Sequence, residues 1–190
     1  MKNEDDDLEI DDIITNLNKP KRIKSGRKGK VGEAGIVNDL NLRFAELLTK
    51  NPSFGNFNRS VGSGNRWGQK VNLSQNAIQV FSGDITTPPA FKFVIESKKG
   101  YNDIDLFDCF SGKNRGLDEF LKQVTDDSVR SGKKPLLIWR KDRKEKVAFL
   151  KMEFNGDTAT GYGTVIHYKE WMGLTLNDLL KEPDEFFFEL

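Results

Sequence analysis

A short apolar run that ends in alternating charged residues constrains this chain more than any other feature of its sequence. Residues 91–99 read FKFVIESKK, in which Glu96 and Lys98 follow the apolar positions. The apolar positions predict a buried strand, namely Phe91, Phe93, Val94 and Ile95. Because side chains alternate across a strand, Glu96 and Lys98 share the face of Val94. A carboxylate and an ammonium group at the end of a buried strand are costly unless they have a use there.

A second carboxylate precedes this strand. Asp84 ends the Ser-Gly-Asp stretch at 82–84, and Pro88-Pro89 interrupts any helix between it and the strand. Two carboxylates and a lysine can hold a hard divalent cation, typically Mg²⁺, and position a water beside it. The pattern indicates a nuclease site, although an Asp followed by Glu-x-Lys also arises by chance in a chain with 31% charged residues.

Length and composition restrict the class of protein. A chain of 190 residues with 14 phenylalanines is long enough for one domain with a sizeable core. No apolar run approaches the roughly 18 residues of a membrane span, and the acidic start lacks the apolar region of a secretory signal. The single Cys109 excludes an internal disulfide and fits a reducing cytoplasm. With His167 as the sole histidine, a Cys/His zinc site within one chain is excluded.

The formal net charge of +1 conceals a strong asymmetry along the chain. Residues 1–12 carry seven acids and one lysine, and residues 182–190 carry four acids and no base. The intervening residues are therefore strongly basic, which favours a polyanionic partner. We expect residues 1–30 to form a flexible charged tail, because few apolar residues accompany its charges. Its seven bases between 19 and 30 fit either a solubilising arm or an arm that binds phosphates.

An amphipathic helix is predicted over about 32–49. Its apolar residues recur at helical spacing: Ile36, Val37, Leu40, Phe44, Leu47 and Leu48. Glu33 lies on the same stripe, one turn before Val37. A carboxylate in the first turn interacts favourably with the helix dipole and so stabilises the helix. Its core-facing position also fits a role in a metal site.

A glycine-rich stretch follows at 58–69, NRSVGSGNRWGQ. Its glycines allow a close backbone approach to a ligand, and Arg59, Ser63 and Arg66 supply donors for phosphates. The stretch lacks the Gly-Lys-Ser/Thr end of a nucleotide P-loop. A plain hairpin loop explains the stretch equally well.

The second half predicts alternating helices and strands, and hence a mixed α/β sheet with helices on its faces. Gln123 lies at the border of the apolar stripe of one helix, where it is either solvated or faces the site. The expected elements are a strand at 106–110, a helix at 116–130, strands at 135–139 and 147–152, and a short helix at 176–180 with Thr175 as its N-cap.

Taken in order, these residues resemble the PD-(D/E)XK nuclease superfamily, most closely the Holliday junction resolvases and related phage-type endonucleases. The resemblance covers about Lys28–Leu150 and departs from the family motif at Gly83, where proline is usual before the aspartate. It includes Lys28-Gly29, Glu33, Arg59-x-x-Gly62-Ser63-Gly64, Gly83-Asp84, Phe93–Lys98, Gln123 and Pro135–Ile138.

The resemblance implies a restriction-endonuclease-like α/β fold, with a central mixed β-sheet flanked by helices, over residues 31–190. The motif-bearing core would span about 31–150, and residues 151–190 would be a C-terminal extension without a recognisable counterpart. The implied catalytic residues are Glu33, Asp84, Glu96, Lys98 and Gln123. Asp84 and Glu96 would bind Mg²⁺, or Mn²⁺ in its place, with Glu33 as an additional acid, and Lys98 would assist the attacking water. The implied DNA-binding residues are Lys28, Lys30, Arg59, Ser63, Arg66 and Lys99.

The implied activity is hydrolysis of DNA phosphodiester bonds at branched DNA, in the cytoplasm and, for a phage-encoded protein, in that of the host. A nuclease that nicks or cuts other DNA and a non-catalytic DNA-binding protein remain alternatives. Two symmetric cuts at a junction require two sites, so a homodimer is expected. Phe186, Phe187, Phe188 and Leu190 are candidates for the dimer contact or for packing against their own core.

Overall fold

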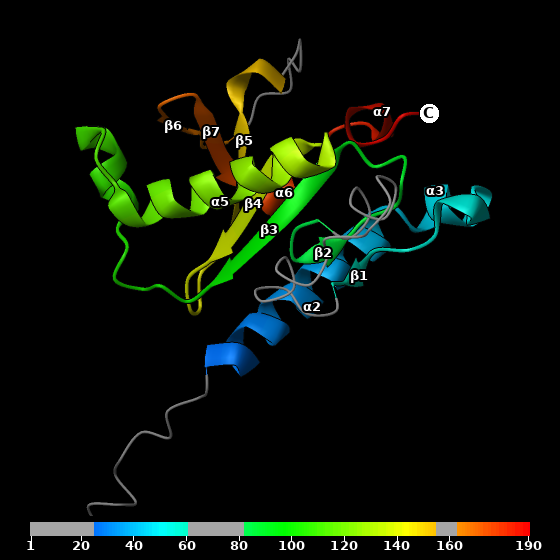
Figure 1. The fold of residues 1–190 in the computed structure, drawn as a ribbon, viewed down its shortest axis with the longest axis horizontal. Helices are drawn as coiled ribbons and strands as arrows, with labels where there is room; N and C mark the ends of the chain where they lie inside the picture. The colour runs from blue at the N-terminus through cyan, green and yellow to red at the C-terminus, as the bar shows by residue number, and fades with distance from the viewer. Residues whose placement is uncertain (1–24, 61–81, 155–162) are drawn as a thin grey trace, which may run out of the picture.

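The computed structural model describes residues 25–60, 82–154 and 163–190 (Figure 1). The predictions for the acidic start and for Ser63 and Arg66 lie outside these ranges. The helices are α2 Ser25–Arg43, α3 Ala45–Lys50, α5 Arg115–Ser131, α6 Leu176–Leu179 and α7 Asp184–Phe187, with 3-10 turns η1 Pro52–Phe54, η3 Leu106–Ser111 and η4 Met152–Phe154. The strands are β1 Asn58–Arg59, β2 Ile85–Thr86, β3 Phe93–Lys99, β4 Lys134–Arg140, β5 Lys146–Lys151, β6 Ile166–Tyr168 and β7 Trp171–Thr175.

The strands form one seven-stranded mixed sheet in the order β1-β2-β3-β4-β5-β7-β6. Strands β3 and β4 pair in parallel, with Glu96 opposite Leu137 and Lys98 opposite Trp139. The other neighbours are antiparallel. Helix α5 makes the crossover between the parallel strands, since parallel neighbours cannot be joined by a tight turn. The sheet and its flanking helices confirm the expected restriction-endonuclease-like α/β fold.

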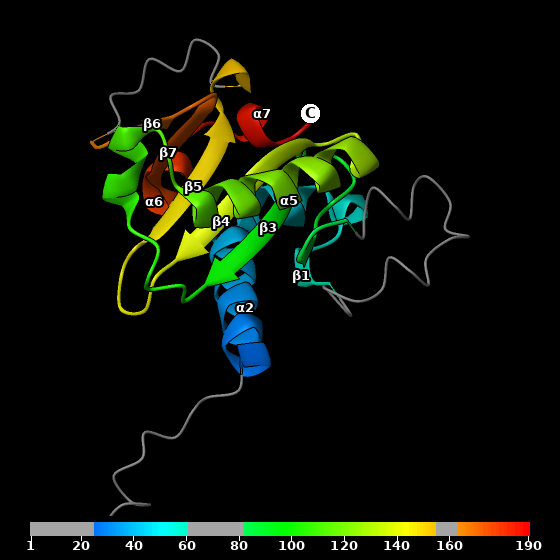
Figure 2. The same cartoon turned by 60° about the vertical axis from the view of Figure 1, so that its left-hand side comes forward.

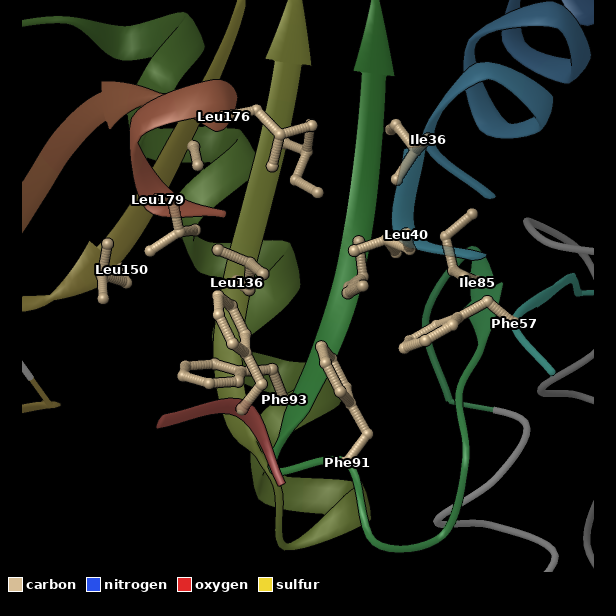
Figure 3. Packing of buried hydrophobic residues seen from close by; sticks show 14 of the residues in the cluster. Ile36, Leu40, Phe57, Ile85, Phe91, Phe93, Leu136, Leu150, Leu176 and Leu179 are labelled. Atoms are coloured by element: carbon tan, nitrogen blue, oxygen red, sulfur yellow. The ribbon is translucent and has the colours of Figure 1, made fainter. Parts of the chain in front are cut away.

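Helices α2 and α5 cover opposite faces of the sheet (Figure 2). On the α2 face, Ile36 and Leu40 belong to one apolar cluster with Ile85 and Phe93 (Figure 3). On the α5 face, a second cluster forms around Leu117, Val124 and Trp139. Both faces of β3 are therefore covered, which explains why its sequence is apolar at consecutive positions.

Two elements differ from the expectations: one helix begins earlier, and one segment is a 3-10 helix where a strand was expected. Helix α2 begins at Ser25, seven residues before the expected start, so the last part of the charged segment is helical. Residues 106–111 form a 3-10 helix and not the predicted strand. The Asp105 side chain accepts a hydrogen bond from the Phe107 amide, and Gly112 ends the turn in a left-handed conformation. These two caps favour a helical turn over an extended run.

The C-terminal residues belong to the fold. Strand β7 pairs with β5, so part of the predicted extension completes the sheet. Phe187 and Phe188 are buried against Phe44 and Phe91 in their own core. Of the two roles expected for these residues, Phe187 and Phe188 therefore take the packing role, because neither ring reaches the surface for a dimer contact. Among the residues that the structure describes, no helix is long and apolar enough to span a membrane.

Candidate active site

The end of β3 presents Glu96 and Lys98 toward α5. The Glu96 side chain is 2% exposed and the Lys98 side chain 14% exposed. The Lys98 ammonium group donates to Glu96 Oε1 at 2.5 Å and to Gln123 Oε1 at 2.7 Å. It also lies 5.5 Å from the centre of the Phe120 ring. The predicted strand, helix and border glutamine thus meet, and Lys98 is held by three partners.

Asp84 is fixed against the neighbouring edge of β3 through its main chain and its side chain. Its amide donates to the Ile95 carbonyl at 2.9 Å, and its Oδ2 accepts from the Ser97 amide at 3.0 Å. Ser97 lies between Glu96 and Lys98 on β3. The carboxylate is consequently tied to the same stretch of backbone that carries the other two groups.

Gly83 permits this close approach. Its φ is +74°, and a Cβ atom there would lie 2.4 Å from the Ile95 carbonyl oxygen. Proline fixes φ near −65° and could not adopt this conformation. The departure of the sequence from the usual proline therefore has a local structural reason.

The two carboxylates lie in an environment that disfavours their charges. Burial, and then the charge of Asp84, raises the pKa of Glu96 to about 8 against the opposing effect of Lys98. Burial also raises the pKa of Asp84, while the Ser97 amide and Lys98 lower it. The charge of Glu33 adds to the rise at Asp84. A cation placed between these acids would relieve both the desolvation and the repulsion.

Glu33 lies close to this pair but has its own partner. Its buried side chain accepts from Arg59 Nε at 2.9 Å. Helix α2 therefore turns Glu33 inward, as its place on the apolar stripe predicted, and β1 supplies the neutralising guanidinium. Because α2 begins at Ser25, Glu33 lies beyond the first turn, so a favourable interaction with the helix dipole does not explain it.

Asp127 also lies near these groups, although no sequence motif predicted it. This residue lies one turn after Gln123 on α5, is 3% exposed and is ion-paired with Arg130. Its charge contributes to the raised pKa of Glu96, and its own pKa is raised by burial. Asp127 could have been found from the sequence by its spacing: it follows Gln123 by four residues, which places both on the same side of the helix.

Of the predicted DNA-binding residues, Arg59 pairs with Glu33, and Lys99 directly follows Lys98 on β3. The Lys99 side chain packs beside Gly32 of α2, where an added Cβ would lie 3.0 Å from the Lys99 Cβ. Lys30 is exposed on α2. Ser63, Arg66 and the side chain of Lys28 lie outside the described part of the structure.

A family model described as "Phage putative PDDEXK endonuclease" matches residues 24–181, most of the chain. The chain belongs to this endonuclease family. The predicted resemblance to phage-type PD-(D/E)XK endonucleases is thereby confirmed, and the matched region includes the strands after residue 150. Comparisons with curated proteins and with solved structures gave no significant match.

Nucleases of the PD-(D/E)XK class generally use divalent metal ions, which need oxygen donors from the chain. Within residues 25–60, 82–154 and 163–190, no group of three or more His, Cys, Asp or Glu residues is arranged to hold a metal ion. The buried Glu96 and the half-buried Asp84 nevertheless form a pair of neighbouring oxygen donors. Mg²⁺ is usually bound by one or two carboxylates together with waters and substrate phosphates. The pair therefore fits such an ion.

Proposed function

We propose that this nuclease is a Mg²⁺-dependent DNA endonuclease that hydrolyses phosphodiester bonds in branched DNA such as the Holliday junction. The observation that supports the chemistry most strongly is the meeting of Asp84, Glu96 and Lys98 at the end of β3. The mutual repulsion and the burial of the two acids favour a cation between them. The proposed substrate follows from the resemblance to the resolvases.

Asp84 and Glu96 would hold the ion, and Glu33 would act as an additional acid once Arg59 turns to a DNA phosphate. The ion, when bound, polarises the scissile phosphate and lowers the pKa of a bound water. Mn²⁺ would satisfy the same oxygen donors. Lys98 would orient the water and stabilise the charge that develops on the phosphate. Gln123 would keep the Lys98 ammonium group in place through its 2.7 Å hydrogen bond.

The proposed phosphate contacts surround these residues. Lys30, Arg59 and Lys99 lie on α2, β1 and β3 in the structure, and Lys28, Ser63 and Arg66 are proposed from the sequence. Arginine and lysine side chains at such positions would hold the DNA backbone and would not read its bases.

The activity is tested with labelled four-way junction, duplex and single-stranded DNA, each with Mg²⁺, with Mn²⁺ and with EDTA. We expect metal-dependent cleavage of the junction, loss of cleavage in Glu96→Gln, and DNA binding at least as tight in that variant. Lys98→Ala should lower the rate about 100-fold, as expected for the loss of one electrostatic group. Glu119→Gln is the matched control, because Glu119 is an exposed glutamate on α5.

Three other results of these cleavage and binding assays would contradict or change the proposal. Wild-type cleavage by Glu96→Gln contradicts the assigned site. Equal cleavage of duplex and junction favours a nuclease of broader substrate range, and binding without cleavage favours a non-catalytic DNA-binding protein.

Paired cutting of a junction requires two sites, and we propose a homodimer for this reason. Sedimentation at micromolar concentration, with and without junction DNA, checks this proposal. A monomer under both conditions rules out paired cutting by a stable dimer and favours a nicking nuclease.

A further inference from the structure

Tyr101 is a half-exposed aromatic residue two positions after the end of β3. It is 49% exposed, and its φ is +54°. A bulky side chain at a positive φ is uncommon and carries a conformational cost. Such a residue persists where the surrounding structure fixes it, often at a functional site.

Hydrogen bonds on both sides fix this turn. Gly100 donates to the Arg140 carbonyl at 2.9 Å, and its own carbonyl accepts from the Trp139 indole at 3.1 Å. On the other side, the Asn102 side chain bonds to Asp142 twice, once to its carboxylate and once to its amide. The Tyr101 ring is thus presented from a rigid support.

The ring lies in the same cluster as the proposed catalytic lysine. Tyr101 packs edge-on against Phe120, with ring centres 4.8 Å apart, and Phe120 in turn contacts Lys98. A hollow of about 340 Å³ opens beside them. It is lined by Gly29, Ser97, Lys98, Lys99, Gly100, Tyr101 and Asn102. The hollow thus combines an exposed aromatic ring, two ammonium groups and an α2 wall without a side chain at Gly29.

We propose that this hollow binds an unpaired base of the DNA, with Tyr101 stacking on the base and Lys99 near its phosphate. The inference rests on the proposed nuclease function and specifies its substrate. Bases inside a duplex are covered on both faces by their neighbours, so a base that stacks on Tyr101 must be unpaired or extruded. The shared wall with Lys98 places that base next to the scissile phosphate. The preferred substrate is therefore DNA with an unpaired nucleotide at the cut, as at a branch point.

The test compares three duplexes of one sequence in Mg²⁺: fully paired, with one unpaired base at the cut position, and with an abasic nucleotide there. We expect wild-type protein to prefer the unpaired base. Tyr101→Asn should lower kcat/KM on that substrate about 10- to 100-fold, the range for loss of one stacked base. Its effect on the abasic DNA should be small. Tyr101→Phe should retain the preference because it keeps the ring.

Asparagine is chosen because it tolerates a positive φ, so the variant keeps the turn without the ring. Phe107→Ala is the matched control, since Phe107 is an aromatic residue that is 77% exposed on η3 and does not line the hollow. An equal loss for Tyr101→Asn on all three substrates, or no loss on any, overturns the inference.

A second measurement distinguishes failure of the base site from failure of the proposed nuclease function. Stacking is read independently from the fluorescence of 2-aminopurine at the unpaired position, with Ca²⁺ in place of Mg²⁺. Tyr101-dependent quenching in Ca²⁺, together with no cleavage of any substrate in Mg²⁺, supports the base site and contradicts the nuclease. Cleavage without Tyr101-dependent quenching contradicts the base site alone.

Discussion

The raised pKa of Glu96 links the stability of the metal-free protein to pH. Burial, and then the charge of Asp84, raises it to about 8 from an ordinary value of 4.5. Between these values the folded state binds more protons than the unfolded state, so the free energy of unfolding falls as pH rises. We expect this fall to be smaller in Glu96→Gln, by a few kcal/mol at most at about 1.4 kcal/mol per pKa unit.

Urea unfolding in EDTA at pH 5 and pH 8 measures the effect for both proteins. Equal pH dependence of wild type and Glu96→Gln would contradict a destabilising charge at this position. Addition of Mg²⁺ at pH 8 should stabilise wild type more than the variant, because the variant lacks one proposed ligand.

Gly83 and Gly132 form a matched pair for the close approach that holds Asp84. Both have φ near +70°, but an added Cβ meets the Ile95 carbonyl oxygen at Gly83 and no atom within 4 Å at Gly132. Gly132→Ala should cost about 1 kcal/mol for its conformation alone. Gly83→Ala should cost about 1–3 kcal/mol more because of overpacking.

Urea unfolding of both variants and a cleavage assay check this difference. Equal destabilisation would show that β3 moves away from the turn without cost. A loss of cleavage in Gly83→Ala alone is expected, since the displaced backbone carries Asp84.

At the residue scale, the sequence was informative where chemistry and periodicity coincided. Strand alternation placed Glu96 and Lys98 on one face, whereas helical periodicity placed Gln123 only at the border of an apolar stripe and the family resemblance implied its site role. Asp127 was missed because charged residues on a helix are usually solvated, and its burial depends on how α5 lies against the sheet.

At the scale of elements, long periodic segments were predicted well and short ones less so. Helix α5 and strand β4 agree with the predicted 116–130 and 135–139 within one residue at each end. Strand β7 was not predicted, because Gly173 interrupts a run of only five residues. Glycine is required at position 173 because of packing between strands: an added Cβ would lie 2.5 Å from the Phe149 ring.

The C-terminal phenylalanines stabilise the α2 face of the sheet. Phe188 is fully buried and packs edge-on against Phe44, Phe57 and Phe91. Phe188→Ala should therefore destabilise the protein by about 3–5 kcal/mol. Leu190→Ala, at an exposed position, should change stability by less than about 0.5 kcal/mol.

Urea unfolding of the two variants measures the contrast, and sedimentation of both checks their association. Equal stabilities would contradict the packing of Phe188 in its own core. Dissociation of a wild-type dimer by Leu190→Ala would instead assign the C-terminus to an interface.

At the scale of the whole molecule, the start of α2 defines where the charged tail can be removed. Deletion of residues 1–24 spares the helix, whereas deletion to Lys30 would remove its first six residues. We expect the shortened protein to fold and to bind DNA more weakly if Lys19, Lys21, Arg22 and Lys24 bind phosphates. The slope of log K against log salt should become shallower by about 0.9 for each phosphate that the tail no longer neutralises. An unchanged slope would favour the solubilising arm.

The coverage of β3 on both faces has a consequence for how this protein can diverge. Phe93 and Ile95 face α2 and contribute to packing, whereas Glu96 and Lys98 face α5 and carry the proposed chemistry. Substitutions on the first face will be tolerated when volume is conserved, and those on the second will not. Relatives should therefore exchange apolar residues of similar volume at one set of alternate positions along a single strand, while the other set stays fixed.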